Sequence, residues 1–163
     1  MKAALQLADL AGAHAFAELL AAELKEGDCV LFSGDLGVGK TTIIERVART
    51  LGYQGDVSSP TFTLAHHYDG IEPELLHIDA YRLSGEAEFE DMGLDFHGDQ
   101  VVHLIEWGER VQKLFPNALR LEIVFGEGEQ RDMTLSSTST RWTQLAEKLA
   151  KLADETKPST VPS

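Results

Sequence analysis

The stretch 30-VLFSGDLGVGKTTIIERV-47 decides the fold class of this chain. It opens with an apolar run that predicts a strand and closes with a pattern that predicts a helix. Between them, Gly34, Gly39, Lys40 and Thr41 fit the spacing G-x-x-x-x-G-K-[ST]. A strand, such a loop and a helix in this order are typical of a phosphate-binding loop.

The residue types of this loop suit a phosphate group. Glycine lets the backbone turn where a Cβ would clash, so that successive N–H groups can point inward around the phosphate. Lys40 would neutralise outer phosphate oxygens at the positive end of the helix, and the Thr41 hydroxyl would complete the oxygen shell of Mg²⁺. A glycine-rich turn that only enters a helix is the alternative. The candidate nucleotide-binding residues are Gly34, Asp35, Gly37, Val38, Gly39, Lys40, Thr41 and Thr42.

A phosphate loop needs an acidic partner that holds Mg²⁺, directly or through water, and positions an attacking water. Two candidates end apolar runs: Asp79 in "ELLHIDAYR" and Glu106 in "VVHLIEWGER". Parallel strands deliver residues to a site beyond their carboxyl ends, which is where both acids are expected. For each acid, a solvated carboxylate at a strand end is the alternative. Lys40, Asp79 and Glu106 are therefore the predicted catalytic residues.

Two further groups of polar residues lie between the loop and the acids. Ser58, Ser59 and Thr61 offer hydroxyls on a segment that Pro60 partly stiffens, and such a segment can sense a terminal phosphate and become ordered when it binds. A polar loop that leads into a strand is an equal alternative. His66 and His67 are adjacent on a predicted strand and would face opposite sides, which disfavours a histidine metal site.

The order of elements predicts an α/β fold. Strands are expected near 29–33, 62–68, 74–79, 101–106, 119–125 and 131–136, and helices near 10–25, 40–51, 85–91, 108–114 and 139–152. The predicted fold is P-loop NTPase-like: a mostly parallel sheet flanked by helices, with a C-terminal antiparallel hairpin formed by "LRLEIVF" and "RDMTLSS" at the end of the sheet. A length of 163 residues fits one domain, placed at 1–152, with a polar, flexible tail at 153–163.

Composition restricts the partners and the compartment. The net charge of −13 disfavours an extensive grip on a phosphate backbone, and hence direct nucleic-acid binding, and favours protein partners. The apolar N-terminal stretch is expected to form an amphipathic helix capped by Asp9 rather than a signal peptide. No apolar run approaches the roughly 18 to 20 residues that span a bilayer. The single Cys29, expected to be buried, fits a reducing compartment, so a cytoplasmic protein is predicted.

The nucleotide base is predicted to be adenine. The guanine-reading motif [NT]-K-x-D is missing from the sequence, because "TKPS" at 156–159 lacks the aspartate. Spacing alone identifies no arginine finger, which predicts slow hydrolysis by the isolated protein and acceleration by a partner. ATP and Mg²⁺ are therefore the expected cofactors.

Four blocks together resemble a known family. "GDLGVGKTT", "SSPTFTL", "HIDAYRL" and "IEW", in this order and spacing, are similar to the TsaE (YjeE) family of bacterial ATPases in tRNA threonylcarbamoyladenosine (t6A) biosynthesis. The resemblance covers about residues 5–150. It implies an ATPase that acts on the complex of the TsaB and TsaD proteins between catalytic turnovers.

The resemblance also implies roles for single residues. Residues 37–42 would cradle the nucleotide, Thr41 and Glu106 would hold Mg²⁺, and Asp79 would position water or support the metal. The segment Ser59, Pro60 and Thr61 matches a switch-like segment, Trp107 the tryptophan after the acid, and Arg131 an arginine near the nucleotide. The sequence departs from the family at Val38, where alanine is commoner, and at "WGER", where Trp-Pro-Glu is more frequent.

Two other functions remain open at this point. A small-molecule phosphotransferase shares the loop but needs a basic, lidded acceptor pocket, whereas a hairpin and a helix are expected after Glu106. A nucleotide-gated interaction module would change its affinity for a partner without significant turnover.

Overall fold

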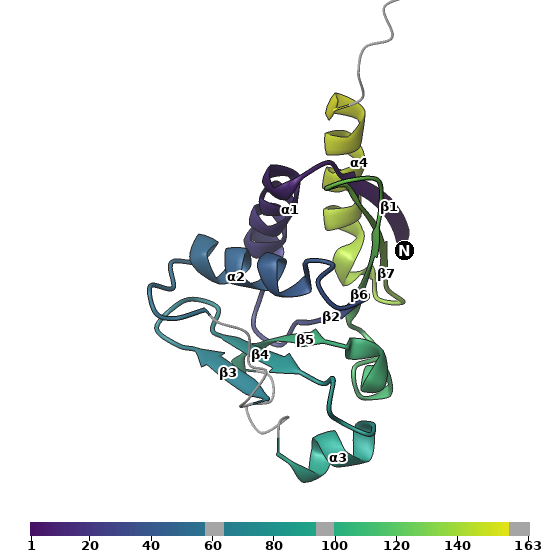
Figure 1. Cartoon of the computed structure of the whole chain (residues 1–163). Helices are drawn as coiled ribbons and strands as arrows, with labels where there is room; N and C mark the ends of the chain where they lie inside the picture. Colours follow the sequence, from purple (N-terminus) through teal and green to yellow (C-terminus); the bar gives the residue numbers. More distant parts are fainter. Residues whose placement is uncertain (58–63, 94–99, 157–163) are drawn as a thin grey trace, which may run out of the picture.

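A seven-stranded mixed sheet with the order β1-β7-β6-β2-β5-β4-β3 forms the centre of the protein (Figure 1). The computed structural model describes residues 1–57, 64–93 and 100–156. The strands are β1 (Lys2–Leu7), β2 (Cys29–Ser33), β3 (Ala65–Tyr68), β4 (Leu75–Asp79), β5 (Val102–Glu106), β6 (Leu119–Phe125) and β7 (Arg131–Ser136). The helices are α1 (Leu10–Glu23), α2 (Lys40–Thr50), α3 (Glu86–Asp91) and α4 (Thr143–Thr156), with the short 3₁₀ helices η2 (Gly108–Arg110), η3 (Gln112–Leu114) and η4 (Thr140–Trp142).

The middle of the sheet is parallel and its two edges are antiparallel. Strands β6, β2, β5 and β4 run parallel to one another. The pairs β1–β7, β7–β6 and β4–β3 are antiparallel. The prediction of an α/β sheet with a C-terminal hairpin is thus confirmed, but the sheet is mixed rather than mostly parallel.

The two faces of the sheet carry separate apolar cores. Helices α1, α2 and α4 cover one face, as Figure 1 shows, and bury Phe16, Ile44 and Leu145 against it. Helix α3 and the segment 108–118 cover part of the other face, where Phe89 and Val111 are buried. The central strands therefore read as continuous apolar runs, because both of their faces are covered.

Strand β1 was not predicted from the sequence. Residues 2–7 pair antiparallel with β7, in the register Leu5↔Met133, and bury Leu5 and Leu7. The hairpin of β6 and β7 is therefore not at the end of the sheet. The preference of "KAALQL" for a strand comes from this long-range pairing, because its alternation of apolar residues is too short to separate it from the helix that follows.

Two predicted helices differ from the structure. The segment 108–114 forms η2 and η3 instead of one helix, because Val111 between them leaves the helical region with a φ of −128°. The predicted helix at 139–152 begins as η4, and the α-helix α4 starts only at Thr143. Of the predicted strand at 62–68, the residues before 64 lie outside the described part of the chain.

The predicted helix with its Asp9 cap, and the predicted burial of Cys29, are confirmed. The Asp9 side chain accepts a hydrogen bond from the Gly12 N–H at 3.0 Å and caps α1. Cys29 is buried and free. In the part of the chain that the structure describes, no helix has the length and apolar character that crossing a membrane requires.

The parallel strands fix where the site lies. Strand β2, which leads into the glycine loop, lies between β5 and β6. In register, Glu106 at the end of β5 pairs with Phe32 of β2 and with Asp79 at the end of β4. The loop and both acids therefore meet at the carboxyl ends of the parallel strands, as the parallel arrangement predicts.

Candidate functional site

The glycine loop is closely packed at its start and open at its outer edge. A Cβ added to Gly34, whose φ is +145°, would lie 2.4 Å from the Ile123 carbonyl oxygen of β6. Gly39, which precedes α2, has a φ of +116°, and an added Cβ would meet nothing within 4 Å. Gly34 thus lets the loop pass against the sheet, whereas Gly39 turns the backbone toward open space.

Lys40 lies inside the loop rather than in solvent. Its side-chain Nζ donates a hydrogen bond to the Gly34 carbonyl oxygen and lies 3.8 Å from the centre of the Trp107 ring. Burial lowers the pKa of Lys40, and nearby carboxylates oppose this shift. These are Glu106, Glu109, Asp79 and Asp35. The site therefore holds a partly desolvated cation in the centre of the loop.

The contact between Thr41 and Glu106 joins the glycine loop to the carboxyl end of β5. The Thr41 hydroxyl donates a hydrogen bond of 2.8 Å to Glu106 Oε1. Glu106 is only 5% exposed. Asp79 lines the same hollow, and its Oδ1 accepts a hydrogen bond of 2.9 Å from the Tyr81 N–H. The two acids predicted from the strand ends are therefore together, in different environments.

The second oxygen of Glu106 has a partner that sequence reasoning missed. His77 Nε2 lies 2.7 Å from Glu106 Oε2, and His77 Nδ1 lies 3.0 Å from the Tyr68 hydroxyl. Burial raises the pKa of the Tyr68 phenol well above its ordinary value. The only sequence signal for His77 is its polarity inside an apolar strand, two residues before Asp79 and so on the same face.

Two hollows lie beside the loop and share Gly37, Gly39 and Thr42. The charged hollow, of 390 Å³, is also lined by Leu36, Lys40, Thr41, Asp79, Tyr81, Arg82, Glu106 and Trp107. The apolar hollow, of 250 Å³, is also lined by Leu7, Asp9, Leu10, Ala13, Val38, Ile43, Ile123, Glu129 and Arg131. A ligand that crosses the loop would therefore meet charged groups at one end and mainly apolar side chains at the other.

Arg131 braces the loop from β7. Its Nε donates a hydrogen bond of 3.1 Å to the Val38 carbonyl oxygen, and its guanidinium lies 4.7 Å from the centre of the Phe125 ring. Its Nη1 donates at 3.0 Å to the Gln130 carbonyl oxygen. Arg131 is thus positioned on the apolar side of the loop and holds the backbone at Val38.

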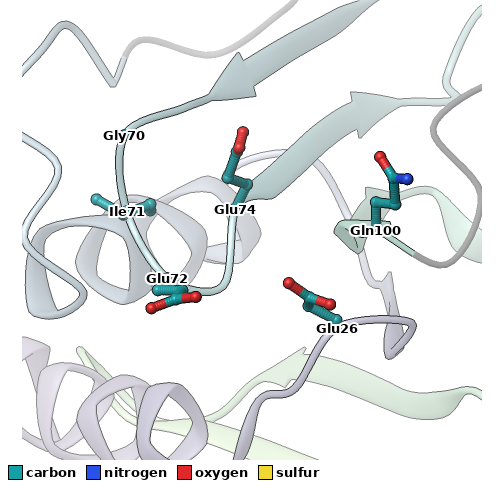
Figure 2. Close-up of a pocket in the computed structure, with 6 residues that line it drawn as sticks. All are labelled: Glu26, Gly70, Ile71, Glu72, Glu74 and Gln100. Atoms are coloured by element: carbon teal, nitrogen blue, oxygen red, sulfur yellow. The ribbon is translucent and has the colours of Figure 1, made fainter.

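A larger hollow of 630 Å³ lies elsewhere and is unsuited to phosphate (Figure 2). Its lining includes the carboxylates Glu26, Glu72 and Glu74, which would repel an anion. Glu26, Glu74 and Gln100 shortly precede β2, β4 and β5, so this hollow lies at the amino ends of the strands. The glycine loop lies at the opposite, carboxyl ends of these strands.

The other predicted residues lie either outside the described part of the chain or beside the charged hollow. Ser59, Pro60 and Thr61 lie outside the described residues. Trp107 packs against the Tyr81 ring at 5.0 Å between centres and also lines the charged hollow. Arg82 also lines that hollow; it directly follows "DAY" at a strand end, but nothing in its spacing predicts the direction of its side chain.

The donor set at the loop is a hydroxyl and carboxylates. Within residues 1–57, 64–93 and 100–156, there is no group of three or more His, Cys, Asp or Glu side chains that could hold a metal ion. The Thr41 hydroxyl and the Glu106 and Asp79 carboxylates are hard oxygen donors, which suit Mg²⁺. Mg²⁺ commonly takes one or two protein carboxylates and completes its shell with water and substrate phosphates. The residues present therefore fit this ion.

Comparison with known proteins gives consistent matches over most of the chain. The family model described as "Threonylcarbamoyl adenosine biosynthesis protein TsaE" matches residues 7–133. A relative from Streptomyces coelicolor, named "tRNA threonylcarbamoyladenosine biosynthesis protein TsaE", is 44% identical over an alignment of 131 residues, and the match covers 76% of this chain and 88% of the relative. A relative of the same name from Bacillus subtilis is 42% identical over 142 residues, 84% of this chain and 87% of the relative. The crystal structure of Bacillus subtilis YdiB has a TM-score of 0.75 and 29% identity, and the match covers 93% of this chain and 96% of that one.

Proposed function

This chain belongs to the TsaE family of threonylcarbamoyl adenosine biosynthesis proteins, and we propose that it is a magnesium-dependent ATPase built on the P-loop fold. Family membership gives it a role in the biosynthesis of t6A in tRNA. The finer proposal concerns how the chain serves that role: it binds ATP with Mg²⁺, hydrolyses it slowly alone, and turns over faster with its protein partners.

One observation carries the proposal: the Thr41 hydroxyl lies 2.8 Å from Glu106 Oε1, at the mouth of a glycine loop that also holds Lys40. A hydroxyl and a carboxylate from these two elements are the protein ligands that nucleotide-bound Mg²⁺ uses in P-loop proteins. Thr41 and Glu106 would hold the ion. When bound, Mg²⁺ would neutralise charge that develops on the phosphate oxygens.

The phosphates would lie on the loop and at the first turn of α2. The N–H groups of the loop and of the helix N-terminus supply donors and positive potential. Lys40 would supply a full charge there, because a phosphate nearby stabilises its ammonium against the burial that lowers its pKa. The open space beside Gly39 leaves the backbone accessible to a ligand.

The base would lie in the apolar hollow. This hollow adjoins the loop at Gly37 and Thr42, and its wall includes Leu10 and Ile123. Apolar walls with few polar groups are typical of sites that bind a planar base. Adenine is favoured because the guanine-reading motif is missing from the sequence. Arg131 would hold the loop at Val38 in the shape that the nucleotide needs.

Hydrolysis requires a water in line with the terminal phosphate. Asp79 would accept a hydrogen bond from this water, with its own carboxylate fixed by the Tyr81 N–H at 2.9 Å. The water oxygen would bond to the terminal phosphorus while the bond to the leaving ADP oxygen breaks. Lys40 would stabilise the charge on the transferred group.

The protein partners proposed are TsaB and TsaD, on the basis of family membership. The net charge of −13 favours contact with proteins over an unaided grip on tRNA. Ser59, Pro60 and Thr61, outside the described residues, are proposed as the segment that responds to the terminal phosphate. Hydrolysis would then act on the complex of TsaB and TsaD between its catalytic turnovers.

A matched pair of threonine variants tests the proposal. Isothermal calorimetry would measure ADP binding with and without Mg²⁺ to the wild type, to Thr41→Val, and to Thr50→Val. Thr50 is the control, because it lies on the same helix and donates only to the Arg46 carbonyl at 2.7 Å. We expect Mg²⁺ to strengthen binding to the wild type and to Thr50→Val but not to Thr41→Val. Nucleotide binding that is undetectable in the wild type, or an equal effect of Mg²⁺ in all three proteins, would contradict the proposal.

A further inference from the structure

A buried chain of hydrogen bonds leads from the edge of the sheet to the Glu106 carboxylate. It runs from the Tyr68 hydroxyl of β3 through the His77 ring of β4 to Glu106 of β5, with contacts of 3.0 Å and 2.7 Å. Tyr68 and His77 are both 0% exposed. Three neighbouring strands therefore each contribute one polar side chain to the face of the sheet that α2 covers.

The strand pairings create this alignment. His77 and Asp79 alternate on the same face of β4, and Asp79 pairs with Glu106 in the parallel register. His66 pairs with His77 across the antiparallel β3–β4 register, so Tyr68 is the diagonal neighbour of His77. A shift of register by one residue would turn these side chains to the opposite face.

With a neutral His77 ring and an ionised Glu106, the donors and acceptors of the chain match when each group donates toward the carboxylate. In this arrangement Tyr68, whose phenol stays protonated because burial raises its pKa, donates to His77 Nδ1. A neutral imidazole that accepts at Nδ1 carries its proton on Nε2. The Nε2–H then donates to Glu106 Oε2, while Thr41 donates to Oε1. Each carboxylate oxygen has one fixed partner, so both the plane and the rotation of the carboxylate are set.

We infer that His77, held by Tyr68, is a positioning residue that keeps Glu106 Oε1 directed toward Thr41. This inference rests on the proposed function, because it assigns a purpose to the orientation of a metal-holding carboxylate. Partners behind a metal ligand fix its orientation and its basicity, and their loss commonly costs about 10- to 100-fold in metal affinity or activity.

Four variants separate positioning from packing. His77→Leu removes both hydrogen bonds, His77→Gln keeps an N–H donor and an oxygen acceptor, and Tyr68→Phe removes only the hydroxyl. Tyr53→Phe is the matched control, because the Tyr53 ring packs against the edge of the Tyr68 ring at 4.8 Å. All four variants are compared at equal folded fraction by circular dichroism and thermal melting.

The main readout is the Mg²⁺ concentration that half-saturates binding of a fluorescent ADP analogue. We expect His77→Leu to raise it about 10- to 100-fold, Tyr68→Phe to raise it less, and His77→Gln to recover part of the loss. The Mg²⁺-free affinity for the analogue should stay within about twofold of the wild-type value, because the loop itself is intact. In turnover of Mg-ATP, kcat should fall more than KM changes.

The outcomes separate this inference from the proposed function. Normal Mg²⁺-dependent binding by the wild type, with unchanged half-saturation in His77→Leu, overturns the positioning role alone. A parallel loss of Mg²⁺-free affinity overturns it too, because that pattern means general damage to the loop. A wild type that binds no nucleotide overturns both.

A second readout needs no nucleotide. Nitrogen-15 NMR of the wild-type histidine rings should show His77 as the Nε2–H tautomer, and Tyr68→Phe should shift its Nδ1 resonance. An Nδ1–H tautomer in the wild type would overturn the hydrogen-bond chain.

Discussion

Asp79 and Glu106 occupy the same register position at the carboxyl ends of the adjacent parallel strands β4 and β5. Their environments differ. Glu106 is buried between the Thr41 hydroxyl and the His77 ring, whereas Asp79 lines the charged hollow and accepts a hydrogen bond from the Tyr81 N–H. This difference supports the proposal that Glu106 would hold Mg²⁺ and Asp79 would position the water.

Glu106→Gln is expected to lower kcat for Mg-ATP by about 100-fold or more, while the Kd for nucleotide changes by less than about tenfold. The amide keeps the shape of the side chain but loses the negative charge that, in the proposal, would hold Mg²⁺. Single-turnover kinetics and calorimetry measure the two quantities separately. Full turnover by this variant would transfer the metal role to Asp79.

Lys40→Ala should weaken ATP binding by about 10- to 150-fold, because a hydrogen bond to a charged group contributes about 1.5–3 kcal/mol. Lys113→Ala is the control, since Lys113 is an exposed lysine on η3. Fluorescence titration with a labelled ATP gives both affinities. An unchanged affinity in Lys40→Ala would contradict the phosphate-binding loop.

Gly34→Ala should mainly lower folding stability and Gly37→Ala should mainly weaken nucleotide binding, although both glycines have positive φ. A Cβ at Gly34 meets the Ile123 carbonyl oxygen at 2.4 Å, whereas a Cβ at Gly37 meets nothing within 4 Å. We expect Gly34→Ala to cost about 3 kcal/mol of folding stability or more, a fall in Tm of about 6–12 °C. Gly37→Ala should lose only about 1–2 kcal/mol and should mainly weaken nucleotide binding. Equal falls in Tm would contradict the close approach at Gly34.

Cys29 should stay unreactive while the protein is folded. Burial first, and the nearby Asp28 charge second, raise the pKa of the Cys29 thiol well above its ordinary value of 9.0. At pH 8, Ellman's reagent should react about 100-fold or more slowly than in denaturant, because the thiolate is the nucleophile. Rapid reaction of the native protein would contradict the burial.

The same shift predicts a fall in stability at alkaline pH. At alkaline pH the folded state keeps the Cys29 proton that the unfolded state loses. The contribution of this thiol to the free energy of unfolding is therefore fully present below the unfolded pKa. It is lost as the pH rises above about 9. Denaturant titrations from pH 8 to pH 10 should show a shallower loss of unfolding free energy in Cys29→Ala than in the wild type. Parallel slopes would contradict the assignment to Cys29.

The loop and the two acids could be predicted from sequence because their signals are local. Gly34 to Thr41 form one continuous motif, and Asp79 and Glu106 each end an apolar run. Parallel strands then bring their carboxyl ends together without any knowledge of the exact register. The order of the elements therefore predicts that all these residues lie at the carboxyl ends of the parallel strands.

The remaining features depend on contacts between distant segments. Strand β1 joins the sheet by pairing with β7, more than a hundred residues later in the chain. The contact of Tyr68 with His77 depends on the register of two short antiparallel strands, and no local pattern sets that register. The break at Val111, which divides a predicted helix into η2 and η3, likewise has no proline or glycine to announce it. Sequence patterns therefore locate the site but not the groups that orient it.

The most direct measurement is phosphate release from Mg-ATP by the purified protein, alone and with TsaB and TsaD, with Lys40→Ala as the background. Slow release by the protein alone and marked stimulation by the two partners, both absent in Lys40→Ala, is the predicted result. Release by the wild type that equals the Lys40→Ala background with and without partners, despite intact ATP binding, would contradict the ATPase and favour a nucleotide-gated interaction module.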